Sequence, residues 1–328
     1  MKKTHNQETK IEEVLDYERI RYIRKGYGLI TAILVALGWF FLIPKLVERI
    51  WPHKIENQAI PFFLYYTVHE ASFIIMNFVM WIVYNLEWSF IERYKILDSP
   101  WPWNQDPEKW KNLLKKTIIS LLINQLIVLP LLIGSDYFIS KVSPYRTDLD
   151  SFPSSFEIIW QTIVFMVIED FSFYWTHRAL HWDKIYPYIH KIHHQYVYSV
   201  SIASEYSHPV EYLLSNCIPS SLGPLILGKK VHLATYLLWI VLRVAETTDG
   251  HSGYDFSWSP FRLLPMSGSS EFHQYHHVVF KGNYSSFFTY LDRLCGTVNK
   301  RYEEHVEKMK EKINTQENKL QNLKEKQN

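Results

Sequence analysis

HRALHWDKIYPYIHKIHH, residues 177–194, and its later echo EFHQYHH, residues 271–277, together hold eight histidines in three clusters. The first cluster has the spacing H-x-x-x-H, and the other two share the spacing H-x-x-H-H. Histidines three or four residues apart lie on one face of a helix, where they can bind one ion. Neighbouring histidines point about 100° apart, so each H-x-x-H-H cluster can serve two metal ions. The clusters consist of His177 and His181, of His190, His193 and His194, and of His273, His276 and His277.

These clusters have a structural alternative to metal binding. A single histidine is usually a surface residue or a satisfied core residue, but eight imidazoles in three clusters would make a poor core. A structural zinc site needs only four ligands and usually includes cysteine, whereas Cys217 and Cys295 are isolated and form no C-x-x-C motif. The clusters therefore predict a metal centre. Imidazole also binds iron, copper and nickel, so the ligand type alone does not identify the metal.

Tryptophan and tyrosine are frequent in this chain of 328 residues, with 12 Trp and 22 Tyr, and they accompany long apolar runs. Both residue types favour membrane interfaces, so we expect a membrane protein. The mean hydropathy of -0.15 predicts that much of the chain lies outside the bilayer. The formal net charge of only +2 gives no reason to expect nucleic-acid binding.

Four apolar runs are candidates to cross a bilayer. We expect an all-α integral membrane protein with about four transmembrane helices in two hairpins and a histidine-rich helical catalytic domain on the cytosolic side. The first run is expected to end at Pro44, whereas Pro130 kinks the third run without ending it. The runs are 27–43, 60–86, 117–133 and 156–175, and the expected organisation is a polar N-terminal arm (1–26), transmembrane helices (27–175), a histidine-box catalytic region with interfacial helices (176–298) and a charged C-terminal tail (299–328).

Positive charge predicts the orientation in the membrane. Lysine and arginine are concentrated in the N-terminal arm and between the second and third runs, and such segments stay on the cytosolic side. Both termini and the histidine clusters are therefore expected in the cytosol. The shorter apolar stretches 212–227 and 234–244 are interpreted as re-entrant or interfacial helices that close the metal site against the membrane. Lys324 and Lys326 match a K-x-K-x-x retrieval signal, which predicts the endoplasmic reticulum membrane.

The composition of the clusters favours one kind of chemistry. Many neutral imidazoles without bridging carboxylates, next to a membrane, suggest non-haem iron that activates dioxygen to oxidise an unactivated C–H bond of an apolar substrate. Zinc cannot supply this redox chemistry. The sequence has no nucleotide-binding G-x-G-x-x-G, haem-attachment C-x-x-C-H or P-loop pattern. The electrons must therefore come from a partner.

At this point the sequence resembles a known family. The three histidine boxes, in this order, are similar to those of the fatty acid hydroxylase and sterol desaturase superfamily. The surrounding sequence looks closest to the C-4 methylsterol monooxygenases, on the stretches EDFSFYWTHRALH (169–181), YIHKIHHQY (188–196), ASEYSHPVE (203–211) and TTDGHSGYDF (247–256). The resemblance covers roughly residues 90–296.

The resemblance implies a membrane-bound di-iron oxygenase of the endoplasmic reticulum. Such an enzyme oxidises a sterol C-4 methyl group through alcohol and aldehyde to carboxylate. Members of the family take electrons from NAD(P)H through cytochrome b5 and its reductase. The expected partners are therefore a sterol, cytochrome b5 with its reductase, and membrane lipid.

The resemblance also implies roles for single residues. The eight box histidines become iron ligands and His251 a ninth, while related enzymes often have a second histidine where this chain has Thr247. Asp249 or water is then the substitute for a tenth ligand. Asp170 is expected to accept a hydrogen bond from a ligand histidine and orient it, and His208 to support the site or the fold. The sequence does not choose among Glu211, Glu246 and Glu271, which flank the clusters similarly.

Other functions remain open at this stage. Oxidation at another sterol position, such as ring desaturation or removal of a C-24 alkyl group, would use the same boxes, and so would hydroxylation of fatty acyl chains. A non-catalytic membrane scaffold is expected to lose box histidines, and none is missing here. A metal transporter would place its ionisable residues within the membrane crossings, whereas these histidines follow them.

Overall fold

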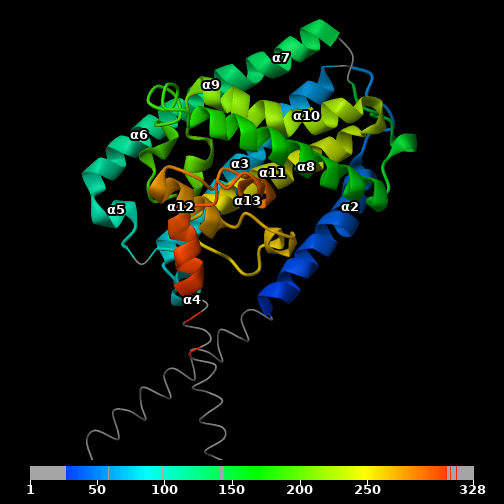
Figure 1. The fold of residues 1–328 in the computed structure, drawn as a ribbon. Helices are drawn as coiled ribbons and strands as arrows, with labels where there is room; N and C mark the ends of the chain where they lie inside the picture. Colours follow the sequence, from blue (N-terminus) through cyan, green and yellow to red (C-terminus); the bar gives the residue numbers. More distant parts are fainter. Residues whose placement is uncertain are drawn as a thin grey trace, which may run out of the picture.

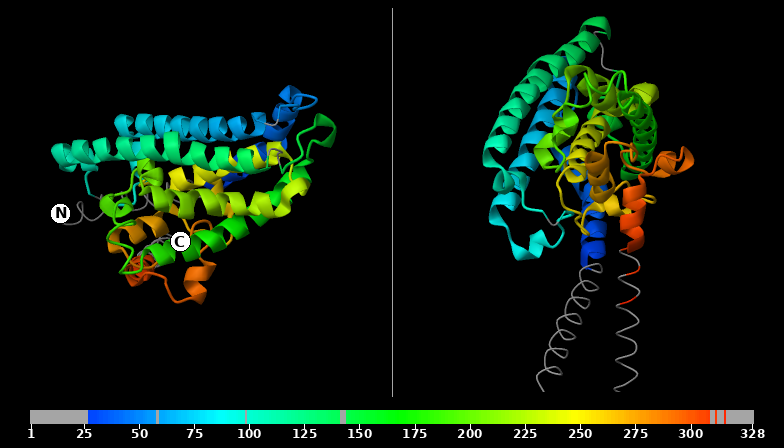
Figure 2. Two further views of the ribbon diagram at one scale, coloured as in Figure 1. Left: turned by 90° about the horizontal axis from the view of Figure 1, so that it is seen from above. Right: turned by 60° about the vertical axis from the view of Figure 1, so that its left-hand side comes forward.

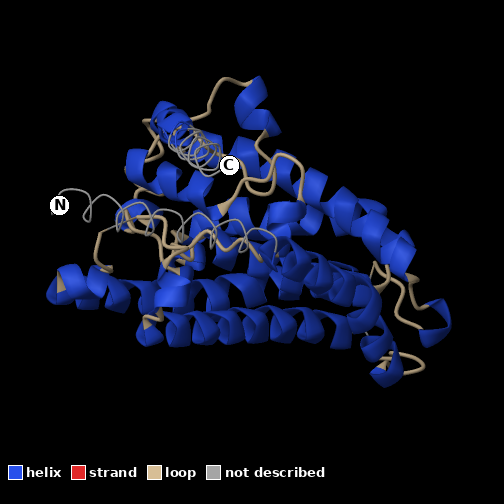
Figure 3. Cartoon of the chain, turned by 90° about the horizontal axis from the view of Figure 1, so that it is seen from below, coloured by secondary structure: helices blue, strands red, loops and turns tan. Residues whose placement is uncertain are grey.

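The computed structural model describes residues 27–57, 59–97, 99–140 and 144–308, together with residues 311 and 315. Within these ranges the chain forms helices joined by turns, and three isolated bridges are its only β-type pairings (Figure 3). The predicted all-α class is therefore confirmed. The N-terminal arm and the Lys324/Lys326 signal lie outside the described residues.

The fold consists of long helices that short helical turns connect (Figure 1). The first helix runs from Tyr27 to Ile50 and ends in α2. The remaining elements used below are α3 (Ile60–Leu86), α6 (Pro107–Ile123), α7 (Leu129–Ser140), α8 (Ser155–Leu180), α9 (Pro209–Glu211), α10 (Ile218–Leu227), α11 (Leu233–Gly250), α12 (Ser270–Val279) and α13 (Tyr290–Leu294), with the shorter turns η1 (Gly38–Leu42), η2 (Asn124–Val128), η4 (His193–Gln195), η5 (Ser201–Glu205) and η6 (Tyr212–Cys217).

Three helices in the described part of the chain are long and apolar enough to cross a membrane: Tyr27–Ile50, Ile60–Leu86 and Pro107–Gly134. Their outward side chains are apolar and exposed, as at Phe63 and Leu131, each 68% exposed, which suits contact with lipid. The predicted fourth run does form a helix, α8, but α8 is not among these candidates. It carries Glu169 and Asp170, both fully buried, so its polar face points into the protein.

Helices continue through three prolines that follow a π-helical turn. A π-helical turn ends two residues before each one: η1 before Pro44, η2 before Pro130 and η6 before Pro219. Proline cannot donate a backbone hydrogen bond and its ring collides with the carbonyl four residues earlier. A wider turn at this point relieves the collision. The third run thus continues through Pro130, as predicted, whereas the expected end at Pro44 is wrong because the helix continues to Ile50.

The helices form layers. Figure 2 shows α3 beside the helix that runs through α6 and α7, with α8, α10 and α11 in the layer beneath. Helix α11 packs along α3, and α10 packs along α8. Their shared core includes the fully buried Phe165 and Trp239. Helices α10 and α11, whose apolar parts were expected to be interfacial, are not candidate spans, and most of α11 is buried.

The C-terminal tail begins as a helix over 300–308 that packs on α12. The ring centroids of Tyr302 and Phe272 lie 5.1 Å apart, and His305 Nε2 lies 2.9 Å from a carboxylate oxygen of Glu271. This helix and the start of the first helix, at Tyr27, lie on the same side of the molecule as α12 (Figure 1). The start of the charged tail therefore packs against an element that carries histidine boxes.

Candidate metal centre

Nine histidines come together in two groups, and in each group the candidate ligand atoms all lie within 4.8 Å of one another. They are the eight box histidines and His251. The five-histidine group consists of His177, His181, His190, His194 and His276, and the four-histidine group consists of His193, His251, His273 and His277.

The five-histidine group joins the end of α8 to α12. His177 lies in the last turn of α8, and His181 is the residue that caps this helix. The Nε2 atom of His177 lies 3.0 Å from that of His190, and the Nε2 atom of His194 lies 3.1 Å from that of His190. His276, on α12, reaches the same point, with its Nε2 atom 3.3 Å from that of His181. Five imidazoles thus converge from three segments.

The four-histidine group joins the end of α11 to α12. His251 caps α11, and its Nε2 atom lies 3.3 Å from that of His193 and 2.9 Å from that of His273. His277 completes the group, with its Nε2 atom 3.1 Å from that of His273. The group contains no fifth histidine from the described part of the chain.

The two members of each adjacent histidine pair belong to different groups. His193 and His194 separate in this way, and so do His276 and His277. On α12 the separation follows from helix geometry. Residues 182–192 instead form successive turns that lead into η4. The second box therefore splits between the groups without a regular helix.

Backbone carbonyls orient most of the rings. A carbonyl only accepts hydrogen bonds, so each of these Nδ1 atoms carries the proton and the Nε2 atom carries a lone pair. The same assignment holds for a ring that faces a carboxylate. The Nδ1 contacts are His177 with Tyr284 O (2.8 Å), His193 with Tyr206 O (3.0 Å), His251 with Thr247 O (2.8 Å), His276 with Gly282 O (2.7 Å), His277 with Tyr196 O (2.8 Å) and His190 with Glu211 Oε1 (2.8 Å).

This arrangement of protons tests whether the groups suit a cation. In the pairs His177/His190 and His193/His251, both Nδ1 atoms donate elsewhere, so two Nε2 lone pairs face each other at 3.0 and 3.3 Å with no proton between them. Such contacts repel unless a positive ion binds both nitrogens. Each group therefore has the donor set of a metal site, and six of the nine rings carry the supporting hydrogen bond that metal-binding imidazoles usually have.

Burial keeps the imidazoles neutral. Removal from water lowers the pKa of every histidine in both groups, to about 3 for His177 and about 4 for His193. A protonated imidazole cannot bind a metal ion. The rings are therefore in the protonation state that metal binding requires.

One carboxylate contacts a ligand candidate directly, and it is Glu211 rather than Asp170. Glu211, at the end of α9, accepts from His190. Burial raises the pKa of Glu211 well above its usual value. Asp170 instead accepts the backbone N–H of Phe288 at 3.0 Å. In place of the expected hydrogen bond from a histidine, Asp170 thus accepts one from the segment 284–288, which also carries the carbonyl that orients His177.

His208 and Asp249 lie outside both groups. His208 caps the start of α9, where its Nδ1 atom accepts from Val210 N at 3.2 Å, so it supports the fold. The Asp249 carboxylate pairs with Arg262 at 3.1 Å and accepts from Ser259 at 3.3 Å. Asp249 therefore does not fill the place of a tenth ligand in this structure.

A buried ion-pair network borders the four-histidine group. Arg243 on α11 lies 2.7 Å from Glu169 on α8 and 2.7 Å from Glu246. Breaking a buried pair of this kind typically costs about 3–5 kcal/mol. Sequence reasoning did not single out Arg243, although an arginine inside an otherwise apolar helical run is an available signal of a buried partner.

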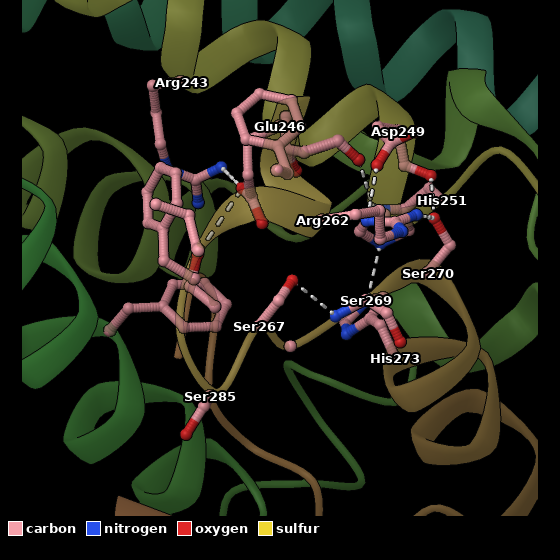
Figure 4. Close-up of a pocket in the computed structure, with 18 residues that line it drawn as sticks. Arg243, Glu246, Asp249, His251, Arg262, Ser267, Ser269, Ser270, His273 and Ser285 are labelled. Carbon is pink, nitrogen blue, oxygen red and sulfur yellow. Dashed lines mark hydrogen bonds and ion pairs between the residues drawn. The ribbon is translucent and has the colours of Figure 1, made fainter. Parts of the chain in front are cut away.

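A small polar pocket lies beside the four-histidine group, with room of about 40 Å³. Figure 4 shows Arg243 and Glu246 across this pocket from His251 and His273. Its lining includes no member of the five-histidine group. Only one of the two groups therefore borders the polar pocket.

A larger apolar cavity of about 480 Å³ adjoins the polar pocket. It lies against the first candidate span, at Trp39 and Phe40, and against α11, at Ala245. The cavity and the polar pocket share Asp249, Phe261 and Leu264 in their linings; Asp249 and Ser259 are the most polar of the cavity's side chains. An apolar molecule in the cavity would thus have one end next to the polar pocket.

Comparison with known proteins identifies the family. The sequence model described as "Fatty acid hydroxylase" matches residues 162–297, which contain all nine histidines. A provisionally named methylsterol monooxygenase of Dictyostelium discoideum is 35% identical over 267 residues, which are 80% of this chain and 95% of that protein. The chain belongs to the fatty acid hydroxylase family. The resemblance in the histidine boxes is thereby confirmed.

Two further relatives of this fatty acid hydroxylase family member align over different shares of the chain. Methylsterol monooxygenase 2-2 of Arabidopsis thaliana is 34% identical over 270 residues, 81% of this chain and 92% of that protein. The very-long-chain aldehyde decarbonylase GL1-11 of Oryza sativa is 48% identical over 143 residues, 43% of this chain. The aligned region spans 53% of that decarbonylase, about half its length. No solved structure is significantly similar to this chain.

Proposed function

We propose that this protein is a membrane-bound oxygenase that oxidises the C-4 methyl group of a sterol. The observation that carries the proposal is the apolar cavity of about 480 Å³, which adjoins the polar pocket beside the four-histidine group. This size lies within the roughly 300–1,000 Å³ typical of sites for ligands of this scale. The methylsterol monooxygenases among the relatives, which align over most of this chain, support the choice of substrate.

We assign the nine histidines as ligands of two iron ions. Iron, when bound, would supply the redox chemistry that activates dioxygen for oxidation of a C–H bond. The protein's own contribution is positional: the backbone carbonyls and Glu211 hold the Nδ1 protons, so every oriented ring presents Nε2. Burial of both groups excludes water from the reaction.

Electrons would come from NAD(P)H through cytochrome b5 and its reductase. The sequence contains no motif for a nucleotide or an attached haem, which supports an external donor. The positive charge of the flanking loops supports a cytosolic location of both termini. Together with the K-x-K-x-x pattern at Lys324 and Lys326, it supports the endoplasmic reticulum membrane.

A second candidate substrate is a very-long-chain aldehyde. The observation in its favour is the 48% identity to the rice aldehyde decarbonylase across the histidine region. That similarity covers 43% of this chain. The methylsterol monooxygenases align over about four-fifths of it, so we favour the sterol.

The test is turnover in microsomes that contain the protein, cytochrome b5 and NADH. A mixture of 4-methylated, ring-unsaturated and C-24-alkylated sterols is offered with a very-long-chain aldehyde under oxygen. We expect loss of the 4-methyl sterol and formation of its 4-carboxylate. Consumption of another sterol or of the aldehyde, with the 4-methyl sterol intact, would overturn the substrate assignment.

A further inference from the structure

Glu246 presents an unused acceptor to the polar pocket. Its Oε2 atom accepts from Arg243 Nη1 at 2.7 Å and lies 3.5 Å from Ser286 Oγ. Its Oε1 atom has no hydrogen-bond donor among the described residues, and the side chain is 14% exposed, which is enough to reach the pocket. Glu246 therefore has a free carboxylate oxygen across the pocket from His251 and His273 (Figure 4).

The neighbouring carboxylate of Asp249 is engaged through its Oδ2 atom. Arg262 pairs with Asp249 at 3.1 Å and with Asp255 at 2.9 Å, and Ser259 donates to Asp249 at 3.3 Å. Glu169 pairs with Arg243 but does not line the polar pocket. Glu246 and Asp249 each keep one carboxylate oxygen without a donor among the described residues. Glu246 lines only the polar pocket, whereas Asp249 also lines the apolar cavity, so Glu246 is the carboxylate placed to bind a polar group inside the pocket.

The chemistry of a sterol matches this distribution of polar atoms. A sterol has a hydroxyl on C-3, the ring carbon next to C-4, and the rest of its ring system is apolar. The polar pocket, with room of about 40 Å³, admits the hydroxyl and the neighbouring methyl group but not the rings. The rings fit the adjoining apolar cavity of about 480 Å³.

We propose that Glu246 accepts a hydrogen bond from the 3-hydroxyl of the sterol and so positions the 4-methyl group at the four-histidine group. This inference rests on the proposed function. Glu246 is a positioning residue, because it binds the group beside the reacting carbon. Since the hydroxyl and the methyl lie on neighbouring carbons, fixing one fixes the other.

The experiment compares a 4-methyl sterol with its 3-deoxy analogue, as kcat/KM in the microsomal assay. A site built around a hydrogen bond discriminates against a substrate that lacks the group, and we expect the wild-type protein to prefer the hydroxylated sterol by at least about tenfold. Glu246→Ala should reduce this ratio by at least about fivefold. Glu169→Ala is the matched control, because it removes the other partner of Arg243 and should lower both rates with the ratio unchanged.

The wild-type ratio covers the case in which Glu246→Ala does not fold, because it needs no variant. A wild-type ratio near one, or an unchanged ratio in a folded Glu246→Ala, overturns the inference while the proposed function stands. If the wild-type protein consumes no 4-methyl sterol, the proposed function fails and the inference fails with it.

Discussion

The five-histidine group and the four-histidine group draw on the same sequence boxes but differ in number and surroundings. The boxes of His190 and His273 each contribute to both groups. Only the four-histidine group borders the polar pocket, through His251 and His273. Thr247 lines that pocket. It lies four residues before His251, the same spacing as between His177 and His181.

This difference suggests a division of labour between the groups. Thr247 holds His251 through its backbone carbonyl, at 2.8 Å from Nδ1, while its side chain adds no imidazole. The four-histidine group thus has a side without a ring, and the pocket lies beside it. A group surrounded by five rings has less room for a substrate. The comparison predicts that the substrate binds next to the four-histidine group rather than the five-histidine group.

Removal of a ligand from either group should have the largest effect. In His276→Ala the five-histidine group loses a ring, and in His193→Ala the four-histidine group does. Supporting hydrogen bonds alone are worth about 10–100-fold in metal affinity or activity, so loss of a ligand should reduce turnover by more than about 100-fold. Turnover and iron content per protein are measured on protein purified in detergent, and iron should fall by about half in either variant.

His208→Ala is the control for these variants. It removes a histidine that caps α9 outside both groups, so its iron content should equal that of the wild-type protein. Folding can itself depend on metal, so the amount of protein inserted in the membrane is measured for all three variants. Full turnover by either purified ligand variant would refute the ligand assignment.

Glu211→Gln should reduce iron retention in the five-histidine group by about 10–100-fold. Glu211 is the carboxyl group that accepts from His190, at 2.8 Å, and an amide holds that imidazole less well. Glu271→Gln is the matched control, because Glu271 contacts His305 rather than a ligand. Iron released to a chelator is measured over time. Equal release from both variants would show that the carboxyl group of Glu211 does not support the metal.

Ala245→Phe tests whether the sterol binds in the apolar cavity, because it reduces the space there. Ala245 lines the apolar cavity one residue before Glu246, and a phenyl ring would occupy space that a sterol needs. We expect kcat/KM for the sterol to fall about tenfold, with iron content unchanged because neither group is touched. Ala245→Ser, which keeps the volume, should stay close to the wild-type rate. A normal rate in Ala245→Phe would place the sterol elsewhere.

Much of this picture followed from the sequence, because the relevant signals are local. The box spacing brings the eight histidines near one another, and apolar length marks three of the predicted spans. The continuation of the first helix through Pro44 was missed, since a proline normally reads as an end and the compensating π turn has no sequence signal. The burial of α8 was also missed, because Glu169 is stabilised by Arg243, a residue 74 positions away.

The roles of the carboxylates could not be predicted for the same reason. Glu211 and Asp170 both lie next to histidine boxes in the sequence, and tertiary contacts alone decide that Glu211 reaches His190 while Asp170 binds the backbone of Phe288. The polar pocket likewise depends on three segments that meet only in the fold, at Glu246, His273 and Ser285.

The smallest expected effect concerns the missing imidazole itself. If the four-histidine group is weaker because it has one ring fewer and borders a pocket, it should lose its iron to a chelator before the five-histidine group does. Two kinetic phases of release are then expected in the wild-type protein.

Thr247→His adds a ring four residues before His251, the same spacing as between His177 and His181, and should slow the faster phase of iron release several-fold. Thr247→Val, which matches the size of threonine without a ligand atom, should leave both phases unchanged. A single phase in the wild-type protein, or a fast phase unaltered by Thr247→His, would mean that the number of imidazoles does not distinguish the two groups.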